Sequence, residues 1–517
     1  MPLPELLAIM MVLAVCALLF AGYPVALTLG GVSFAFAAFA HVTGAMDIGL
    51  LYALPQRIFG VMTNTVLLAI PLFVFMGVML ERSRIAEDLL ETMGRLFGSL
   101  PGGLGISVVL VGVLLAAAKG VVGATVVTIA LITLPTMLRH GYDKRLAAGT
   151  VAATATLAQI MPPATVLVLL GDQLNNSYQA AQLAKGNFAP DSVSVSDLFA
   201  GAIVPALTLV ALYLTFLIVV AIVRPAAVPP IGGSEENGGF ARVLKALIAP
   251  VLLIIVVLGS ILIGLATPTE AAAVGAVGAA LLAALRTERA QAAVALCLGA
   301  FALLMVLRTV LDLRDGIGFW LALMVMAALA VGLLFALRAV YRAGYLVPTI
   351  EKTTQTTAMI FTILIGATLF SLVFRGLGGD DLVHRALANL PGGAAGAILA
   401  VMVAMFLLGF VMDAFEIIFV VVPIIAPPLL QMGGVDPVWL GILMAVNLQT
   451  SYMHPPLGPT LFFLRGVAPP EITTRHIYVG IIPFVLLQLL LLLLLWFAPA
   501  LATTLPHLLY GSPGSAS

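Results

Sequence analysis

Apolar stretches of about the length of a membrane-spanning helix recur along the whole of this 517-residue sequence. A helix needs roughly 20 apolar residues to cross the hydrocarbon core of a bilayer. The stretches that meet this requirement lie near 5–22, 24–42, 66–81, 146–170, 199–223, 246–265, 268–285, 292–310, 317–340, 355–374, 438–464 and 477–499. We therefore predict an all-α polytopic integral membrane protein that contacts the lipid bilayer on many sides.

The composition excludes the soluble classes of protein. Only 9% of the residues are charged, whereas a soluble domain carries about 25% charged residues. The net charge is zero and no basic patch predicts nucleic-acid binding. No P-loop, HExxH, CxxC pair or dinucleotide-binding glycine loop occurs, so we expect neither an enzyme nor a bound cofactor. Cys16 and Cys297 lie in apolar stretches, where packing is their expected role.

We expect no soluble domain before the first membrane helix. The first 22 residues contain no basic region and no evident cleavage site, so we expect them to form the first membrane helix. We expect room for neither an ATPase domain nor a periplasmic binding domain. If the chain moves a solute uphill, the energy must then come from an ion gradient or from a partner protein.

Two further apolar stretches, near 104–138 and 394–430, differ from the others because each is interrupted halfway. The first interruption falls at 119–123 and the second at 409–413, and both combine glycine with an ionisable residue. Irregular backbone at membrane depth is tolerated only where protein or a water-filled cavity surrounds it. This pattern predicts two re-entrant helical hairpins.

An internal repeat relates the two hairpins. Five positions recur at a constant offset of 293 residues (434 minus 141). They pair Pro135 with Pro428, Gly141 with Gly434, Asp143 with Asp436, Pro162 with Pro455, and Pro163 with Pro456. Each unit is therefore predicted to contain a hairpin, a tight Gly-x-Asp turn and a helix broken by Pro-Pro.

Basic residues predict that the two units face opposite ways. The loops of the first unit contain Arg82, Arg84, Arg95, Arg139, Lys144 and Arg145, whereas the matching loops of the second contain only Arg375 and Arg385. By the positive-inside rule, the first set is cytoplasmic and the second periplasmic. Inverted-topology repeats with broken helices are typical of secondary transporters, whose site lies near mid-membrane between the repeats. A channel is the less favoured alternative.

The predicted organisation follows from these repeats. It comprises N-terminal scaffold helices (1–69), the first unit (70–175), a periplasmic loop with scaffold helices and an extra apolar insertion near 287–345 (176–354), the second unit (355–465), and a C-terminal helix and tail (466–517). The segment 172–198 contains one lysine and three aspartates, and we expect it to be an outside loop.

Each Pro-Pro pair removes two backbone donors and so leaves carbonyl groups of the preceding helix free. The helix that follows the pair is expected to have its N-terminus near the middle of the membrane. Freed carbonyls suit Na⁺ and helix N-termini suit carboxylates. Hydroxyl and amide side chains before the breaks complete a predicted Na⁺ site, namely Thr154, Thr156, Asn447 and Thr450, with Gln449 and Ser451 beside them. Alternatively, Pro-Pro only kinks the helices and these side chains bond to their own backbone.

Ionisable residues in the membrane are costly and are candidates for function. Asp413 and Glu416 at the second hairpin tip are predicted to contact an ion or proton, to cap the following helix, or both. We expect Lys119 at the first tip to pair with Asp413 or Glu416, to attract a substrate carboxylate or to snorkel to the surface. His454 is a site residue or a helix-end donor, and Glu270 is predicted to cap a helix. The remaining candidates at the tips and breaks are Gly120, Gly123, Thr125 and Gly458.

Several stretches resemble the large membrane subunit, DctM-like, of tripartite ATP-independent periplasmic (TRAP) transporters. They occur in that family's order over nearly the whole chain. They are 70–73, 80–83, 100–103 (LPGG), 141–145 (GYDKR), 159–163 (QIMPP), 266–271 (ATPTEA), 374–379 (FRGLGG), 446–449 (VNLQ) and 455–458 (PPLG).

This resemblance implies an elevator-type transporter of the ion transporter superfamily kind, located in the bacterial inner membrane. It implies Na⁺-coupled uptake of an organic acid, such as a C4-dicarboxylate, that a periplasmic binding protein delivers. It also implies a separate small membrane subunit. Lys119 and His454 depart from the family pattern, and we hypothesise that Lys119 replaces one Na⁺ charge. The alternatives are a stand-alone ion-coupled organic-anion symporter, a tripartite tricarboxylate permease and a membrane-embedded transferase.

Overall fold

The computed structural model describes residues 2–119, 122–188, 190–230, 239–287, 290–311, 316–410 and 412–511. Within these ranges every regular element is a helix. Nine of these helices are long and apolar enough to cross a membrane, and three further helix pairs meet the same test together but bend at a short break. The prediction of an all-α polytopic membrane protein is confirmed.

Two segments of the chain contain a similar succession of helices, although one helix of the first hairpin is matched by a bent pair of helices in the second. The first comprises α4 (Ala69–Arg82), α5 (Ile85–Phe97), α6 (Gly103–Lys119), α7 (Val122–Arg139), α8 (Lys144–Thr156), η3 (Leu157–Gln159), α9 (Thr165–Ala184) and α10 (Val195–Val223). The second comprises α15 (Leu346–Gly376), α16 (Gly379–Ala388), α17 (Gly393–Leu408), α18 (Ala414–Val420), α19 (Val422–Gln431), α20 (Pro437–Ser451), α21 (Pro459–Val467) and α22 (Thr474–Phe497).

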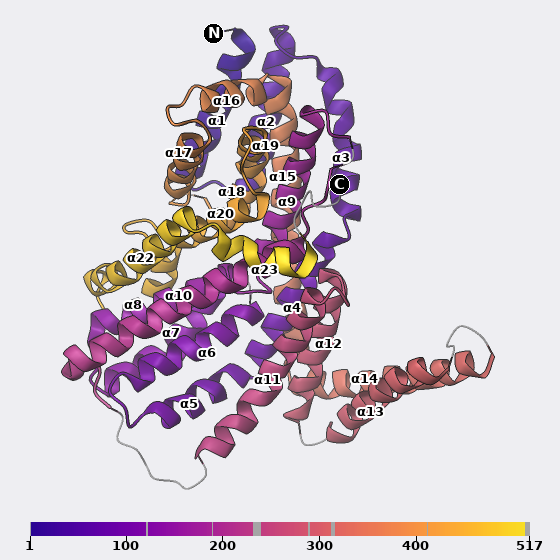
Figure 1. Ribbon diagram of the computed structural model, residues 1–517, viewed down its shortest axis with the longest axis vertical. Helices are drawn as coiled ribbons and strands as arrows, with labels where there is room; N and C mark the ends of the chain where they lie inside the picture. The colour runs from indigo at the N-terminus through magenta and orange to yellow at the C-terminus, as the bar shows by residue number, and fades with distance from the viewer. Residues whose placement is uncertain are drawn as a thin grey trace.

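The remaining helices flank these two segments (Figure 1). They are α1 (Leu3–Phe20), α2 (Val25–Val42), η1 (Ile48–Ala53), α3 (Leu54–Thr63), η2 (Val66–Leu68), η4 (Pro225–Ala227), α11 (Gly239–Leu262), α12 (Pro268–Leu285), α13 (Gln291–Val310), α14 (Gly316–Arg342) and α23 (Ala500–Tyr510). Helix α2 packs on α15 and helix α12 packs on α4. Helices α13 and α14 pack on each other and project from the body of the molecule.

The repeated glycine and aspartate residues have a local structural reason. Gly141 and Gly434 adopt left-handed backbone with φ of +76° and +72°, a conformation that costs glycine little. Asp143 then accepts hydrogen bonds from two backbone N–H groups at the start of α8, and Asp436 accepts one from Trp439 N at the start of α20. Each Gly-x-Asp turn therefore ends a hairpin and caps the next helix.

Helices α8 and α22 pack closely because glycines meet at their contact. A Cβ atom added at Gly149 would lie 2.0 Å from the carbonyl oxygen of Gly480. A Cβ atom at Gly480 would lie 2.0 Å from the carbonyl oxygen of Arg145. Small residues at such contacts allow membrane helices to approach through their backbones.

The structure corrects the prediction for 172–198. Helix α9 continues to Ala184 and α10 begins at Val195, so only the residues between them form a connection. The many polar side chains of this segment led to the prediction of a loop. One face of the helix is nevertheless buried, and on it Leu174, Ser177 and Ala181 recur at helical spacing. This face belongs to the helix that packs on α19. Helix α3, with its bend of 52° into the α4 segment, was also missed.

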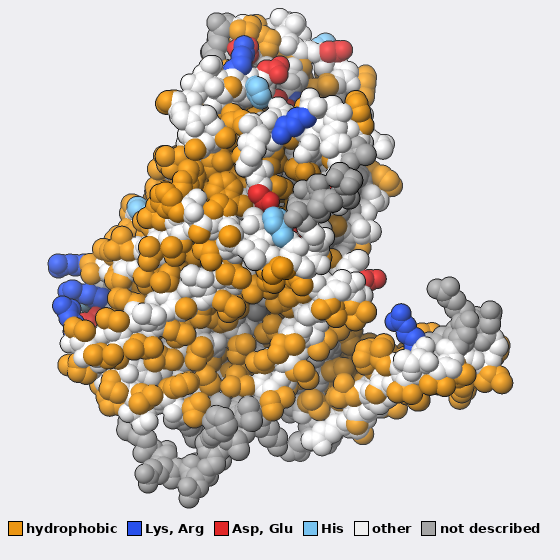
Figure 2. All heavy atoms as spheres, viewed as in Figure 1, with side chains coloured by type: hydrophobic (Ala, Val, Ile, Leu, Met, Phe, Trp, Pro, Cys, Tyr) orange, Lys and Arg blue, Asp and Glu red, His pale blue; other side chains and the backbone are white. Residues whose placement is uncertain are grey.

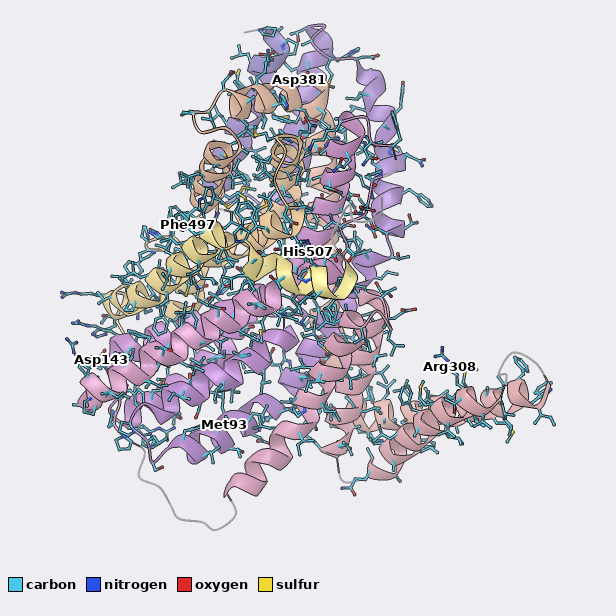
Figure 3. The ribbon with its side chains drawn as sticks, in the orientation of Figure 1. Met93, Asp143, Arg308, Asp381, Phe497 and His507 are labelled. Carbon is cyan, nitrogen blue, oxygen red and sulfur yellow. The ribbon has the colours of Figure 1, made fainter. Side chains whose placement is uncertain are left out.

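Charged side chains gather at the ends of the molecule, whereas apolar side chains cover most of the visible face between them (Figure 2). Lys and Arg side chains cluster at the left edge of this view, over the ends of α8 and α22. Asp143, in the first unit, lies at the lower left of the side-chain view, and Asp381 on α16 lies at its top (Figure 3).

The glycine contact between α8 and α22 generates a stability prediction. Gly149→Ala should lower the melting temperature, because its Cβ would overlap backbone that cannot rotate away; overpacking of this kind costs about 1–3 kcal/mol. Gly259→Ala is the matched control, since nothing lies within 4 Å of a Cβ at that helical position. Thermal unfolding of the purified protein in detergent measures both. Equal melting temperatures for the two variants would contradict the packing described here.

Candidate functional site

The two helices that the Pro-Pro pairs interrupt meet near the centre of the molecule. Helix α8 ends at Thr156 and α9 starts at Thr165 after the loop, whereas α20 ends at Ser451 and α21 starts at Pro459. The peptide bonds between Pro162 and Pro163 and between Pro455 and Pro456 are both cis. The predicted Pro-Pro interruption is therefore observed in both helices.

The N-termini of α9 and α21 carry no side-chain cap. Their N-cap residues, Ala164 and Gly458, have no side chain that can accept a hydrogen bond, and none is formed. The hydroxyl oxygens of Thr165 and Thr460, in the first turns of the two helices, are buried without a partner. Backbone N–H groups, the helix dipole and a free hydroxyl at such an end favour an anionic ligand.

Glycines let the hairpins approach the broken helices. A Cβ at Gly112 of α6 would lie 1.8 Å from Cγ2 of Thr154, and a Cβ at Gly409 would lie 2.2 Å from Oγ of Ser451. A Cβ at Gly123 of α7 would lie 2.9 Å from the ring of Phe463 in α21. Gly123 thus packs closely against the second broken helix, and its predicted role in substrate or ion binding stays a prediction.

A cavity of about 700 Å³ lies between the hairpin tips and the flanking helices α4 and α15. Hairpin residues that include Gly123, Asp413 and Glu416 line it, as do Gln159 and Tyr452 from the broken helices. The flanking helices contribute Val74, Val78, Glu81, Lys352, Gln355, Thr356 and Met359. The first turns of α9 and α21 also reach it, through Val166 and Pro459.

The carboxylates of the cavity are engaged in hydrogen bonds. Oδ1 of Asp413 accepts from Ala414 N at 2.6 Å, and Oε2 of Glu416 accepts from Asp413 N at 2.9 Å. The Asp413 side chain also accepts from the backbone N–H of Glu416, so the two residues form a capping box at the start of α18 and the predicted capping role is confirmed. Glu81 accepts a hydrogen bond from the Thr128 hydroxyl at 2.8 Å. The predicted cap at Glu270 is likewise confirmed, with Thr267 as its partner.

The four predicted Na⁺ ligands have different surroundings. Thr156 and Thr450 donate their hydroxyl protons to the carbonyls of Ala153 and Val446, at 2.9 and 2.8 Å. Asn447 Nδ2 donates to Met402 O of α17 at 2.8 Å. A hydroxyl that donates to backbone keeps its oxygen lone pairs available, so back-bonding does not by itself exclude a cation.

Several buried oxygen atoms near the breaks have no hydrogen-bond partner among the described residues. They are Oγ1 of Thr154, Oε1 of Gln159 and Oε1 of Gln449. Each of these side chains is at most 1% exposed. A buried polar atom without a partner costs about 1–3 kcal/mol, so its presence indicates a ligand or a water molecule.

His454 contacts the second hairpin through aromatic rings. Its imidazole lies edge-on to Phe406 at 5.0 Å and stacks on Phe410 at 5.1 Å between centroids. Nδ1 of His454 is buried without a partner. The second predicted role of His454, as a hydrogen-bond donor at a helix end, is filled by its backbone, because His454 N donates to Ser451 O.

Some predicted residues contribute nothing to this description. Lys119 is the last residue of α6, but its side chain lies outside the described residues, as does the whole of Gly120. The hypothesis that Lys119 replaces a Na⁺ charge therefore stays a prediction. Thr125 is fully buried in α7.

Sequence reasoning missed Tyr213, Gln488 and Lys352. Gln488 Nε2 donates to Tyr213 OH at 2.8 Å and to Thr156 Oγ1 at 3.4 Å. A lone glutamine within the leucine-rich stretch of α22 was a usable signal, because an amide in an apolar helix needs a partner. Lys352 gave no such signal, since only the fold brings α15 to the cavity.

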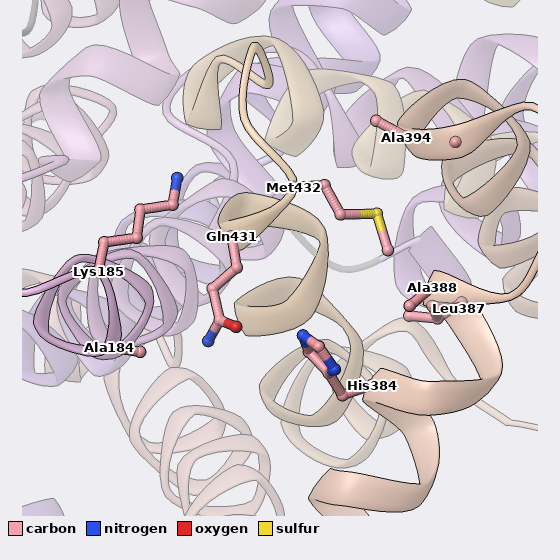
Figure 4. A pocket seen from close by; sticks show the side chains of 9 residues that line it. Ala184, Lys185, His384, Leu387, Ala388, Ala394, Gln431 and Met432 are labelled. Atoms are coloured by element: carbon pink, nitrogen blue, oxygen red, sulfur yellow. The ribbon is translucent and has the colours of Figure 1, made fainter.

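A second cavity, of about 420 Å³, lies away from the Pro-Pro breaks (Figure 4). Lys185, His384, Gln431 and Met432 help to line it, from the ends of α9, α16 and α19. Nζ of Lys185 donates to Leu430 O at 2.8 Å, so this lysine joins the ends of two helices. None of the predicted site residues lies in this cavity.

The chain matches the model of one protein family and is similar to several characterised members of that family. The model of the "Tripartite ATP-independent periplasmic transporter, DctM component" matches residues 11–501. The chain is 26% identical to the C4-dicarboxylate TRAP transporter large permease protein of Rhodobacter capsulatus, over 95% of this chain and 97% of that protein. It is 23% identical to the ectoine TRAP transporter large permease protein of Halomonas elongata, over 97% and 99%.

A solved structure shows the same fold. The YdaH transporter of Alcanivorax borkumensis superposes with a TM-score of 0.55 at 18% sequence identity. The similarity covers 98% of this chain and 100% of that one. At this level of identity the likeness concerns the fold alone.

The capping box at the second hairpin tip generates a second prediction. Asp413→Ala should lower stability by about 1 kcal/mol, because it removes the N-cap acceptor, whereas Asp413→Ser should retain most of it. Melting temperatures of the two variants measure the difference. If the Ser variant is as unstable as the Ala variant, capping is not what Asp413 contributes to the fold.

Proposed function

The chain belongs to the DctM family of tripartite ATP-independent periplasmic transporters, and from this premise we propose that it couples uptake of a carboxylate-bearing organic acid to entry of Na⁺. The relatives are named as permease subunits, so the chain is a multi-pass transport subunit of the bacterial inner membrane rather than an enzyme. The family implies a tripartite system. In our proposal the partners are a small membrane subunit and a periplasmic binding protein.

The observation that carries the proposal is the meeting of two broken helices beside one cavity. The uncapped N-terminus of α9 supplies N–H groups, and the first turns of α9 and α21 supply the Thr165 and Thr460 hydroxyls, which suit a carboxylate. The last turns of α8 and α20 supply oxygen atoms, which suit Na⁺. We assign Thr154, Gln159 and Gln449 to this cation site because their buried oxygens have no protein partner.

Lys352 supplies the positive charge for the substrate in this proposal. Among the described residues that line the 700 Å³ cavity, it is the one lysine or arginine. The three cavity carboxylates already accept hydrogen bonds, two of them as helix caps. A flexible ammonium group in the same cavity as the first turns of α9 and α21 would hold a second carboxylate of the substrate or screen these acids.

The cavity also suggests which state of the transport cycle the structure represents. Its Glu81 lies next to the end of α4, and its Lys352 lies close to the start of α15, shortly after Arg342. The positive-inside rule makes these ends cytoplasmic. We therefore assign an inward-facing state, from which movement of the hairpin units past α4 and α15 would expose the site to the periplasm.

The relatives do not agree on one substrate, since one is named for C4-dicarboxylates and another for ectoine. The substrate is therefore proposed as a class. Melting shifts of the cognate binding protein with a panel of organic acids would identify the member, which then serves as the probe in the uptake experiments below.

Removal of one proposed cation ligand should weaken Na⁺ dependence. In proteoliposomes with all three components, uptake by the parent protein should require inward Na⁺ and fail with K⁺. Thr154→Val should raise the Na⁺ concentration for half-maximal uptake by roughly tenfold, because a coordinating oxygen is lost. Thr215→Val is the control, since that exposed threonine only bonds to Ala211 O. Uptake that is indifferent to Na⁺ in the parent would refute Na⁺ coupling.

Loss of the cavity lysine should weaken substrate binding. Lys352→Gln should raise KM for the acid in counterflow by roughly three- to tenfold, with little change in maximal rate, because an exposed charge contributes modestly. Arg342→Gln, in which another basic residue near the same end of α15 is replaced, should leave KM unchanged. A KM equal to that of the parent would remove Lys352 from the site.

A further inference from the structure

Four buried side chains form a hydrogen-bond cluster where the two units meet. Gln488 Nε2 of α22 donates to Tyr213 OH of α10 at 2.8 Å. Thr156 Oγ1 accepts from Gln488 Nε2 and from Gln449 Nε2, both at 3.4 Å. Each of these four side chains has a relative exposure of 0%.

The positions of the four residues follow the internal repeat. Thr156 and Gln449 are separated by 293 residues, so they occupy equivalent places in the two units, and they bond to each other directly. Each lies in the last turns before a Pro-Pro loop. Tyr213 and Gln488 come from α10 and α22, the helices that follow the broken helices in each unit. The cluster therefore joins both halves of the proposed cation site.

The chemistry of the cluster is costly if its only role is to stabilise the fold. Oε1 of Gln449 and Oε1 of Gln488 are buried without a partner. Apolar side chains of similar shape would pack here without buried carbonyl groups, and replacement of both partners of a buried hydrogen bond is often nearly neutral. The long 3.4 Å bonds to Thr156 add little stability.

We propose that Tyr213 and Gln488 are positioning residues that link the two halves of the cation site, each of which holds one Na⁺, so that binding of the first ion orders the half that binds the second. This inference rests on the proposed Na⁺ coupling. Gln488 holds the Thr156 hydroxyl against the end of α20, and Tyr213 fixes the amide of Gln488. Ordering of α8 by a bound ion is then transmitted through Thr156 and Gln449 to α20, which produces cooperative binding.

The double variant Tyr213→Phe/Gln488→Met tests the link, because it removes the polar groups and keeps the approximate volumes. The melting temperature without Na⁺ should stay close to that of the parent. The Na⁺ Hill slope of uptake should fall from above one to about one, and the half-saturating Na⁺ concentration should rise roughly two- to tenfold. The rise in melting temperature on addition of Na⁺ should shrink in parallel, which reports binding without transport.

Phe484→Leu is the matched packing control. Its ring lies edge-on to Tyr213 at 5.2 Å and to Phe216 at 5.2 Å, but it makes no hydrogen bond in the cluster. This variant should lower the melting temperature by creating space in the core. Its Na⁺ Hill slope should equal that of the parent.

The outcomes separate the inference from the function on which it rests. A parent protein without any Na⁺ dependence overturns the proposed coupling. A Na⁺-dependent parent with a slope of one, or a double variant that keeps the slope and half-saturation of the parent, overturns the link through Tyr213 and Gln488. A double variant that unfolds more easily but retains its Na⁺ response shows that the cluster is only structural.

Discussion

The arrangement around the two helix breaks depends on one constraint, which is that backbone groups in a bilayer must be satisfied within the protein. Each Pro-Pro pair breaks a helix at membrane depth and leaves carbonyls on one side and N–H groups on the other. The chain tolerates two such breaks because both are surrounded by protein. Hairpins α6–α7 and α17–α19 cover them, and Gly112 and Gly409 permit the close approach.

The same breaks place the proposed cation site next to the proposed anion site. Carbonyl and hydroxyl oxygens lie at the ends of α8 and α20, while uncapped N-termini begin α9 and α21. A cation and a carboxylate that occupy these places would lower each other's electrostatic cost, because opposite charges attract strongly where water is excluded. Coupling between the two ligands would then need no separate transmission element. It would follow from shared occupancy of one location.

The repeat is not exact, and its departures lie where the two sides of a transporter must differ. The second hairpin tip carries the Asp413 and Glu416 capping box and a further bend of 55° between α18 and α19. The first segment enters through the bent pair of α3 and α4, whereas α15 is continuous over 31 residues. At that bend Asn64 Nδ2 donates to Asp172 Oδ1 at 2.8 Å, which joins the flanking helix to α9.

The sequence by itself determined the membrane class, the hairpins, the repeat and the broken helices, because hydropathy, proline and glycine act through local backbone physics. It also identified Asp413 as a cap, since Glu416 follows at the spacing of a capping box. Only the tertiary structure decided which polar groups meet. Gln488 lies 332 residues from Thr156, and Lys352 reaches the cavity only through the packing of α15. Such contacts join residues that are distant in the chain, so no local pattern encodes them.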